Sequence, residues 1–70
     1  METSTTLSKR EIEILQLLPE GLSSEEIGWQ LYISKLTVQT HRRNLMRKIG
    51  VNNAQQAISW AFTNGLVKIG

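Results

Sequence analysis

The sequence lacks several features that define other classes of small protein. It contains no cysteine and only one proline, and the absence of cysteine excludes disulfide-stapled scaffolds and thiolate metal centres. No apolar run approaches the roughly 20 residues that a membrane-spanning helix needs. The first six residues have no basic segment followed by an apolar one, so they do not form a secretory signal. These absences lead us to expect a cytoplasmic protein.

A convergent set of ionisable side chains is also missing. His41 is the only histidine, and the chain has no cysteine or aspartate with which it could form a metal site or a catalytic triad. The neighbouring glutamates at 11 and 13, and at 25 and 26, have no nucleophile or oxyanion-stabilising group beside them in the pattern. We therefore expect no enzymatic activity, no catalytic residue, no metal and no cofactor.

The length suits one small domain. The chain has 70 residues, of which 40% are hydrophobic, and a domain of this size buries about 60% of the surface that its unfolded chain exposes. The composition is too apolar for a chain that is disordered throughout. We expect a disordered tail or linker remnant over residues 1–6 and one domain over residues 7–70.

Charge is distributed unevenly along the chain. The formal net charge is +2, yet all six acidic residues lie before residue 27. Residues 35–70 carry six bases and no acid, and five of these bases fall within 14 consecutive positions. Such a concentration favours a polyanionic partner, either nucleic acid or an anionic membrane surface. The alternative is a solvated helix face. The five clustered bases are Lys35, Arg42, Arg43, Arg47 and Lys48.

The chain is expected to be all-α, because capping residues precede each of four helical patterns. In a capping box a serine accepts from the backbone three residues on, and a glutamate there accepts from the serine's own backbone N–H. Single capping residues and a terminal glycine delimit the later helices. The expected elements are helix 8–18 with Ser8 and Glu11, helix 23–31 with Ser23 and Glu26, helix 35–49 after Ser34 and ending at Gly50, and helix 53–64 after Asn52 or Asn53.

The second and third expected helices are separated by a turn of about three residues, which predicts a helix-turn-helix. In that motif the second helix enters the major groove of DNA, and its N-terminal half contacts base edges. The helical period places an apolar side and an opposite, polar side on helix 35–49. Arg pairs with guanine, Gln with adenine, and the Thr methyl group with the thymine methyl group. The candidates for base contacts are Gln39, Thr40 and Arg43.

Several spaced motifs resemble the LuxR-type helix-turn-helix domain, the C-terminal effector domain of response regulators of the NarL/FixJ type. The resemblance covers residues 7–67, nearly the whole chain. Its motifs are Leu7-Ser8-x-Arg10-Glu11-x-Glu13-Ile14-Leu15, Gly21-x-Ser23-x-x-Glu26-Ile27, Leu31-x-Ile33-Ser34-x-x-Thr37-Val38-x-x-His41 and Lys48-Ile49-Gly50-Val51.

The resemblance implies a bacterial, DNA-associated transcription regulator that binds double-stranded DNA. It implies base contacts from the three residues named above and DNA-backbone contacts from a second group. For His41, packing is an equal alternative to a backbone contact. For Arg47, which can lie beyond the groove, plain solvation is slightly favoured over such a contact. An N-terminal receiver or ligand-binding domain is a further partner that the family often has. The expected backbone contacts are Ser34, Lys35, Thr37, His41, Lys48, Arg42 and Arg47.

The fourth helix is often the dimer surface in this family, and here it has more apolar residues than one buried face needs. We expect a homodimer on DNA that uses these residues. The remaining aromatic side chains lie off the basic face, so core or interface packing is expected for them. The expected dimer residues are Ala54, Ala57, Ile58, Trp60 and Ala61, and the remaining aromatics are Trp29, Tyr32 and Phe62.

Three positions depart from the family pattern. Gly28 replaces a common alanine, and glycine inside a helix costs about 0.5–1 kcal/mol relative to alanine, so we expect another helix to cross closely there. Gln39 replaces a common lysine or arginine, which predicts a different target sequence. Ala54 replaces an arginine, so we expect no contact of the kind that an arginine makes at this position.

Two other interpretations remain open at this point. A promoter-binding module similar to sigma-factor region four shares the capped helices and the motif Ser34-x-x-Thr37-Val38. A helical protein-interaction domain would use the apolar excess of helix 53–64 instead of the basic side of helix 35–49.

Overall fold

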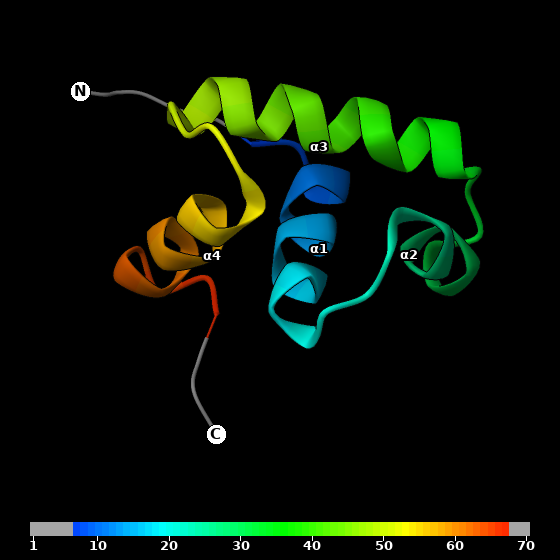
Figure 1. The fold of residues 1–70 in the computed structure, drawn as a ribbon, viewed down its shortest axis with the longest axis horizontal. Helices are drawn as coiled ribbons and strands as arrows, with labels where there is room; N and C mark the ends of the chain where they lie inside the picture. Colours follow the sequence, from blue (N-terminus) through cyan, green and yellow to red (C-terminus); the bar gives the residue numbers. More distant parts are fainter. Residues whose placement is uncertain (1–6, 68–70) are drawn as a thin grey trace.

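The computed structural model describes residues 7–67 and contains four α-helices with one short 3-10 helix (Figure 1). The all-α prediction is confirmed, and each predicted helix is present to within one residue at either end. The prediction for residues 1–6 lies outside the described residues. The helices are α1 (Lys9–Leu17), α2 (Ser24–Leu31), α3 (Lys35–Ile49) and α4 (Ala54–Thr63), with η1 (Leu18–Glu20) after α1.

The predicted caps account for where the helices begin. Ser8 and Glu11 form a complete capping box before α1, and Ser23 and Glu26 form a second one before α2. Asn53, and not Asn52, caps α4 by accepting from the backbone of Gln56. Each cap satisfies N–H groups that the first turn of a helix leaves without a partner.

The helices pack so that α3 lies along one edge of the molecule while α1 runs beneath it between α2 and α4 (Figure 1). The core is formed where the apolar sides of all four helices meet. Leu66 and Val67 pack against this core from the C-terminal side. The fully or nearly fully buried apolar residues are Ile14, Leu15, Leu18, Ile27, Val38, Leu45, Ala57 and Ala61.

The close neighbours of Gly28 are the turn before α3 and the first residue of α3, and not the body of a crossing helix. A Cβ atom at this position would lie 2.6 Å from the carbonyl oxygen of Ile33. The backbone N–H of Ile33 also donates to the Gly28 carbonyl at 3.0 Å. The turn therefore folds back onto α2 at the one residue without a side chain, and this contact fixes the start of α3 relative to α2.

Two aromatic residues are exposed rather than packed in the core. Trp29 is 68% exposed and Tyr32 is 94% exposed, so core packing is wrong for both, and packing in an interface stays a prediction. Tyr32 ends α2 with φ of 59°, in the left-handed region, which is uncommon for a residue with a side chain. Its backbone N–H donates to the carbonyl oxygen of Gly28.

Candidate nucleic-acid interface

The two sides of α3 differ as predicted. Val38 and Leu45 are completely buried and anchor the helix on the core. The opposite side holds Leu36, Thr40, Arg43 and Arg47, which recur at the spacing that places residues along one face of a helix. We call this set the outer stripe. Because the buried side is fixed by packing, the outer stripe is held facing solvent.

The start of α3 presents polar groups next to the outer stripe. The Ser34 hydroxyl accepts from the backbone N–H of Thr37 at 3.0 Å and lies 2.8 Å from the Thr37 hydroxyl. Lys35 is exposed in the first turn. Three predicted backbone-contact residues, Ser34, Lys35 and Thr37, thus lie together at the N-terminus of α3. A helix N-terminus carries partial positive charge and suits phosphate.

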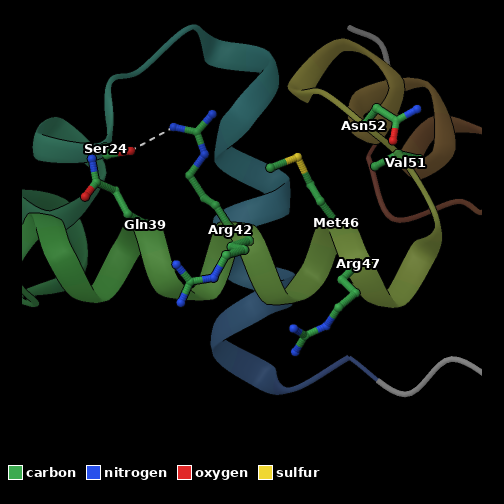
Figure 2. Close-up of a pocket in the computed structure, with 8 residues that line it drawn as sticks. Ser24, Gln39, Arg42, Met46, Arg47, Val51 and Asn52 are labelled. Carbon is green, nitrogen blue, oxygen red and sulfur yellow. Dashed lines mark hydrogen bonds between the residues drawn. The ribbon is translucent and has the colours of Figure 1, made fainter.

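A groove of about 620 Å³ runs beside α3 and gathers four of the predicted DNA-contacting residues. They are Gln39, Arg42, Arg43 and Arg47 (Figure 2). Arg42 points toward α2 and donates to the Ser24 hydroxyl at 2.8 Å. Its charge therefore lies at the first turn of α2, on the wall of the groove (Figure 2).

The groove also contains residues that the sequence interpretation missed. Ser24 and Asn52 provide polar groups on its walls, and Met46 and Val51 provide apolar ones. They come from α2, α3 and the α3–α4 connection, so their convergence depends on tertiary packing. Ser24 could have been found from the sequence, because it is a polar residue at the start of α2 and the first helix of this motif crosses the DNA backbone.

Thr40 and His41 are both partly buried. The Thr40 hydroxyl donates to the carbonyl oxygen of Leu36 at 3.1 Å, which directs its hydrogen to the helix and not to solvent. Gln39 and Arg43 are exposed. The three predicted base-contact residues share one side of α3, with Gln39 and Thr40 in its N-terminal half and Arg43 just past its midpoint.

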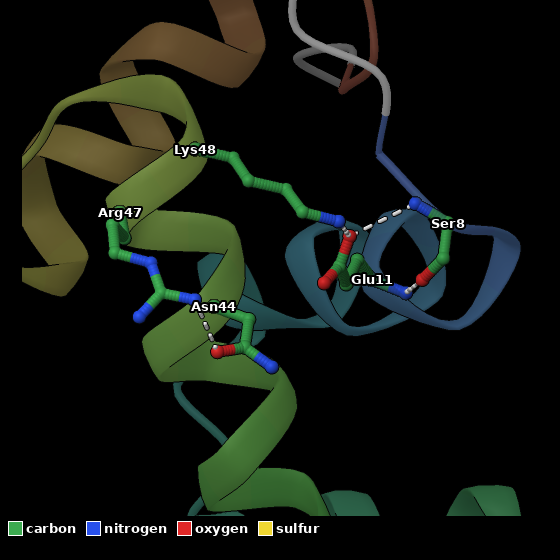
Figure 3. Close-up of polar contacts among 5 residues, drawn as sticks. All are labelled: Ser8, Glu11, Asn44, Arg47 and Lys48. Carbon is green, nitrogen blue, oxygen red and sulfur yellow. Dashed lines mark hydrogen bonds and ion pairs between the residues drawn. The ribbon is translucent and has the colours of Figure 1, made fainter.

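Lys48 is joined to the fold by an ion pair. Its ammonium lies 2.8 Å from a carboxylate oxygen of Glu11 on α1, and the same oxygen accepts from the backbone N–H of Ser8 at 2.9 Å (Figure 3). Arg47, the preceding residue, instead donates to the side-chain oxygen of Asn44 at 3.1 Å. Lys48 thus ties the C-terminal half of α3 to the start of α1, a role that the sequence interpretation did not include.

Glu11 is a buried carboxyl group, only 3% exposed. Burial alone raises its pKa, but hydrogen bonds from Lys48 and from the Ser8 backbone, with the charge of Lys48, outweigh burial and lower the pKa below 4.5. The ionised form is therefore favoured by folding, since a lowered pKa in the folded state means that the charge stabilises that state.

Glu11→Gln is expected to lower the free energy of unfolding by about 1 kcal/mol near pH 7, because it removes a charge-assisted hydrogen bond. The difference from the wild type is fully present above pH 4.5 and shrinks as the pH falls through the lowered pKa of folded Glu11. Urea unfolding between pH 3 and pH 7 measures it.

Glu13→Gln is the matched control for that experiment. Glu13 forms an ion pair with Arg10 at 3.1 Å, and each of the two side chains is more than a third exposed. Exposed pairs of this kind contribute a few tenths of a kcal/mol, so little change is expected at any pH. An equal effect of the two variants would contradict the role given to burial of Glu11.

The predicted dimer residues divide into two groups. Ala57 and Ala61 are completely buried in the core, so the prediction that they contact a partner is wrong for these two. Both small side chains let α4 approach the other helices closely. Ala54, Ile58 and Trp60 keep partial exposure, and the last two also pack against the core.

The part of the chain that the structure describes holds neither a cluster of metal-binding side chains nor a helix that could span a membrane. Among residues 7–67, no group of three His, Cys, Asp or Glu side chains lies together in a way that could hold a metal ion. Within the same range, no helix is long and apolar enough to cross a membrane.

Comparison with known proteins identifies relatives of the whole domain. The chain is 44% identical over 63 residues to the transcriptional regulatory protein DegU of Brevibacillus brevis, covering 90% of this chain and 27% of that protein. It is 51% identical over 61 residues to the CsgBAC operon transcriptional regulatory protein of Escherichia coli (strain K12), covering 87% of this chain and 28% of that protein. The chain thus spans less than a third of the length of these curated relatives.

A solved structure agrees with the observed fold. The transcription factor GerE is 38% identical and superposes with a TM-score of 0.82, covering 94% of this chain and 97% of that chain. The family described as bacterial regulatory proteins, luxR family, matches residues 5–61. This match favours the LuxR-type interpretation over the sigma-factor alternative, and the family is not a class of enzymes. The chain therefore belongs to the luxR family of bacterial regulatory proteins, as a helix-turn-helix DNA-binding domain.

Proposed function

We propose that this domain binds double-stranded DNA in a sequence-specific manner by placing α3 in the major groove. The observation that carries the proposal is the two-sided character of α3. Its Val38 and Leu45 side is buried while Gln39 and Arg43 are exposed. The major groove admits one α-helix and presents a distinct pattern of donors and acceptors for each base pair, and exposed Gln and Arg side chains match that pattern.

We assign base contacts to Gln39, Thr40 and Arg43, and DNA-backbone contacts to a surrounding group. The exposure of Gln39 and Arg43 supports the base contacts, and the position of Ser34, Lys35 and Thr37 at the start of α3 supports the backbone contacts. Lys48 ranks below Lys35 because Glu11 holds its ammonium, and Arg42 ranks below Arg43 because it donates to Ser24. The proposed backbone contacts are Ser34, Lys35, Thr37, His41, Arg42, Arg47 and Lys48.

Selection from a random duplex pool at physiological salt tests the proposed function. The proposal predicts that the chain enriches one motif and binds it at least tenfold more tightly than a scrambled duplex of the same composition. Weak binding without enrichment would contradict it. In that case the apolar residues of α4 and the exposed aromatics of α2 would favour a protein-interaction domain.

Lys35→Ala is expected to weaken binding to the selected and the scrambled duplex by the same factor. A phosphate contact supplies affinity without sequence information, and its loss reduces the slope of log K against log salt by about 1. Lys9→Ala removes the same charge from α1 and should leave the slope unchanged. Titrations at several salt concentrations measure both slopes, and a loss confined to the selected duplex would contradict the role of Lys35.

A homodimer on DNA is part of the proposal. The partial exposure of Ala54, Ile58 and Trp60 on α4 supports it, since a symmetric dimer needs the same surface on both copies. The proposal predicts a repeated motif with half-sites about one helical turn apart. Sedimentation of the chain with the selected duplex should give two chains per duplex, whereas one chain per duplex would contradict the dimer.

Regulation by a second domain is the remaining part of the proposal. We infer that a receiver or ligand-binding domain controls when this domain binds DNA, as the LuxR-type resemblance implies. The names of the relatives, which are regulatory proteins much longer than this chain, support this. A cytoplasmic location in a bacterium, beside the chromosome, follows from the same proposal.

A further inference from the structure

One residue of the outer stripe is neither polar nor basic. Leu36 is 72% exposed and lies in the first turn of α3, whereas the leucine on the opposite side of the helix, Leu45, is completely buried. A single exposed leucine on a protein surface is ordinary. Its place matters here, because the N-terminal residues of such a helix are those that contact base edges.

Thr40 lies one helical turn after Leu36 on the same side of α3, and its methyl group adds to the apolar surface there. Its hydroxyl donates to the Leu36 carbonyl oxygen at 3.1 Å, a bond that threonine commonly forms inside helices. The hydroxyl hydrogen is then not available to a base, and Thr40 offers a methyl group and an acceptor oxygen. Leu36 and Thr40 thus form a short apolar segment, which Arg43 follows on the same stripe.

An apolar segment in the major groove has one natural counterpart. Of the groups that base pairs present there, the C5-methyl group of thymine is the apolar one. We propose that Leu36, together with the Thr40 methyl group, contacts a thymine methyl group and is a specificity-determining residue of this domain. This inference rests on the proposed function, since it requires that α3 enters the major groove.

Replacing thymine by deoxyuridine tests this inference, because the exchange removes the C5-methyl group and leaves base pairing intact. The probe is the duplex that the full chain enriches from a random pool, with its thymines replaced one at a time. For the wild type, at least one replacement is expected to weaken binding about fourfold, the amount that corresponds to one buried methyl group. For Leu36→Ala, the same replacement is expected to change binding less than twofold.

Leu36→Met is the matched control, because it keeps an apolar side chain of similar volume at the same position. It should retain most of the sensitivity to the missing methyl group. Circular dichroism of all variants checks that the substitutions at this exposed position leave the helical fold intact. Equal sensitivity of the wild type and Leu36→Ala, or an enriched motif without a fixed thymine, would overturn the inference and leave the proposed function standing. Failure to enrich any motif would instead overturn the proposed function, and the inference with it.

Discussion

Leu45→Ala is expected to lower the free energy of unfolding by 2–5 kcal/mol, a range typical of large-to-small changes in a core (about 24 cal/mol for each Å³ of remaining cavity). Leu45 is completely buried, at the middle of the apolar side of α3. Domains of this size have roughly 5 kcal/mol of stability or less. The variant is therefore expected to be largely unfolded at 37 °C and to lose DNA binding together with its structure.

Leu36→Ala provides the comparison within the same helix. The chemical change is identical, but Leu36 is 72% exposed, so the expected change is within about 0.5 kcal/mol. Urea unfolding followed by circular dichroism at 25 °C measures both variants. Equal destabilisation would mean that the two sides of α3 are not distinguished by packing, and would contradict the placement of the outer stripe.

Arg43→Ala is expected to cost about 1–3 kcal/mol of binding to the selected duplex, equivalent to about five- to 150-fold in affinity, and to relax the preference at one base position. The physical reason is the loss of a bidentate contact to guanine, which discriminates strongly against other bases. Competition binding with duplexes changed at single positions measures the effect. Similar losses for every duplex would identify Arg43 as a phosphate contact instead.

Arg43→Lys separates charge from geometry at the same site. Lysine keeps the positive charge but lacks the planar fork of donors. Arg43→Lys should bind the scrambled duplex with the same affinity as the wild type. Its affinity for the selected duplex should fall, so the ratio between the two affinities becomes smaller. A full retention of specificity by lysine would contradict the bidentate contact.

The elements of the fold could be predicted because their signals are local. Each helix begins at a residue whose side chain bonds to backbone three positions away, as with Ser8 and Ser23, and no knowledge of the tertiary structure is needed to see it. The side of α3 that faces the core follows from the helical period. The helical period also predicts that Gln39, Thr40 and Arg43 share one side of α3.

The errors concern contacts between residues far apart in the chain. The Lys48–Glu11 pair spans 37 positions and the Arg42–Ser24 bond spans 18, so both depend on how α3 is laid against α1 and α2. The burial of Ala57 and Ala61 depends on how closely α4 approaches the core. The exposure of Trp29 and Tyr32 depends on which side of α2 and of its C-terminal cap packs against the rest of the molecule.

The central claim is that the outer side of α3 is the surface that contacts DNA. Titration of the isotope-labelled chain with the selected duplex, followed by NMR, tests it most directly. We expect the largest shifts at Gln39, Thr40 and Arg43, with contacts from these side chains to base protons in the major groove. Shifts confined to α4 or to the exposed aromatics of α2, with α3 unchanged, would contradict the claim.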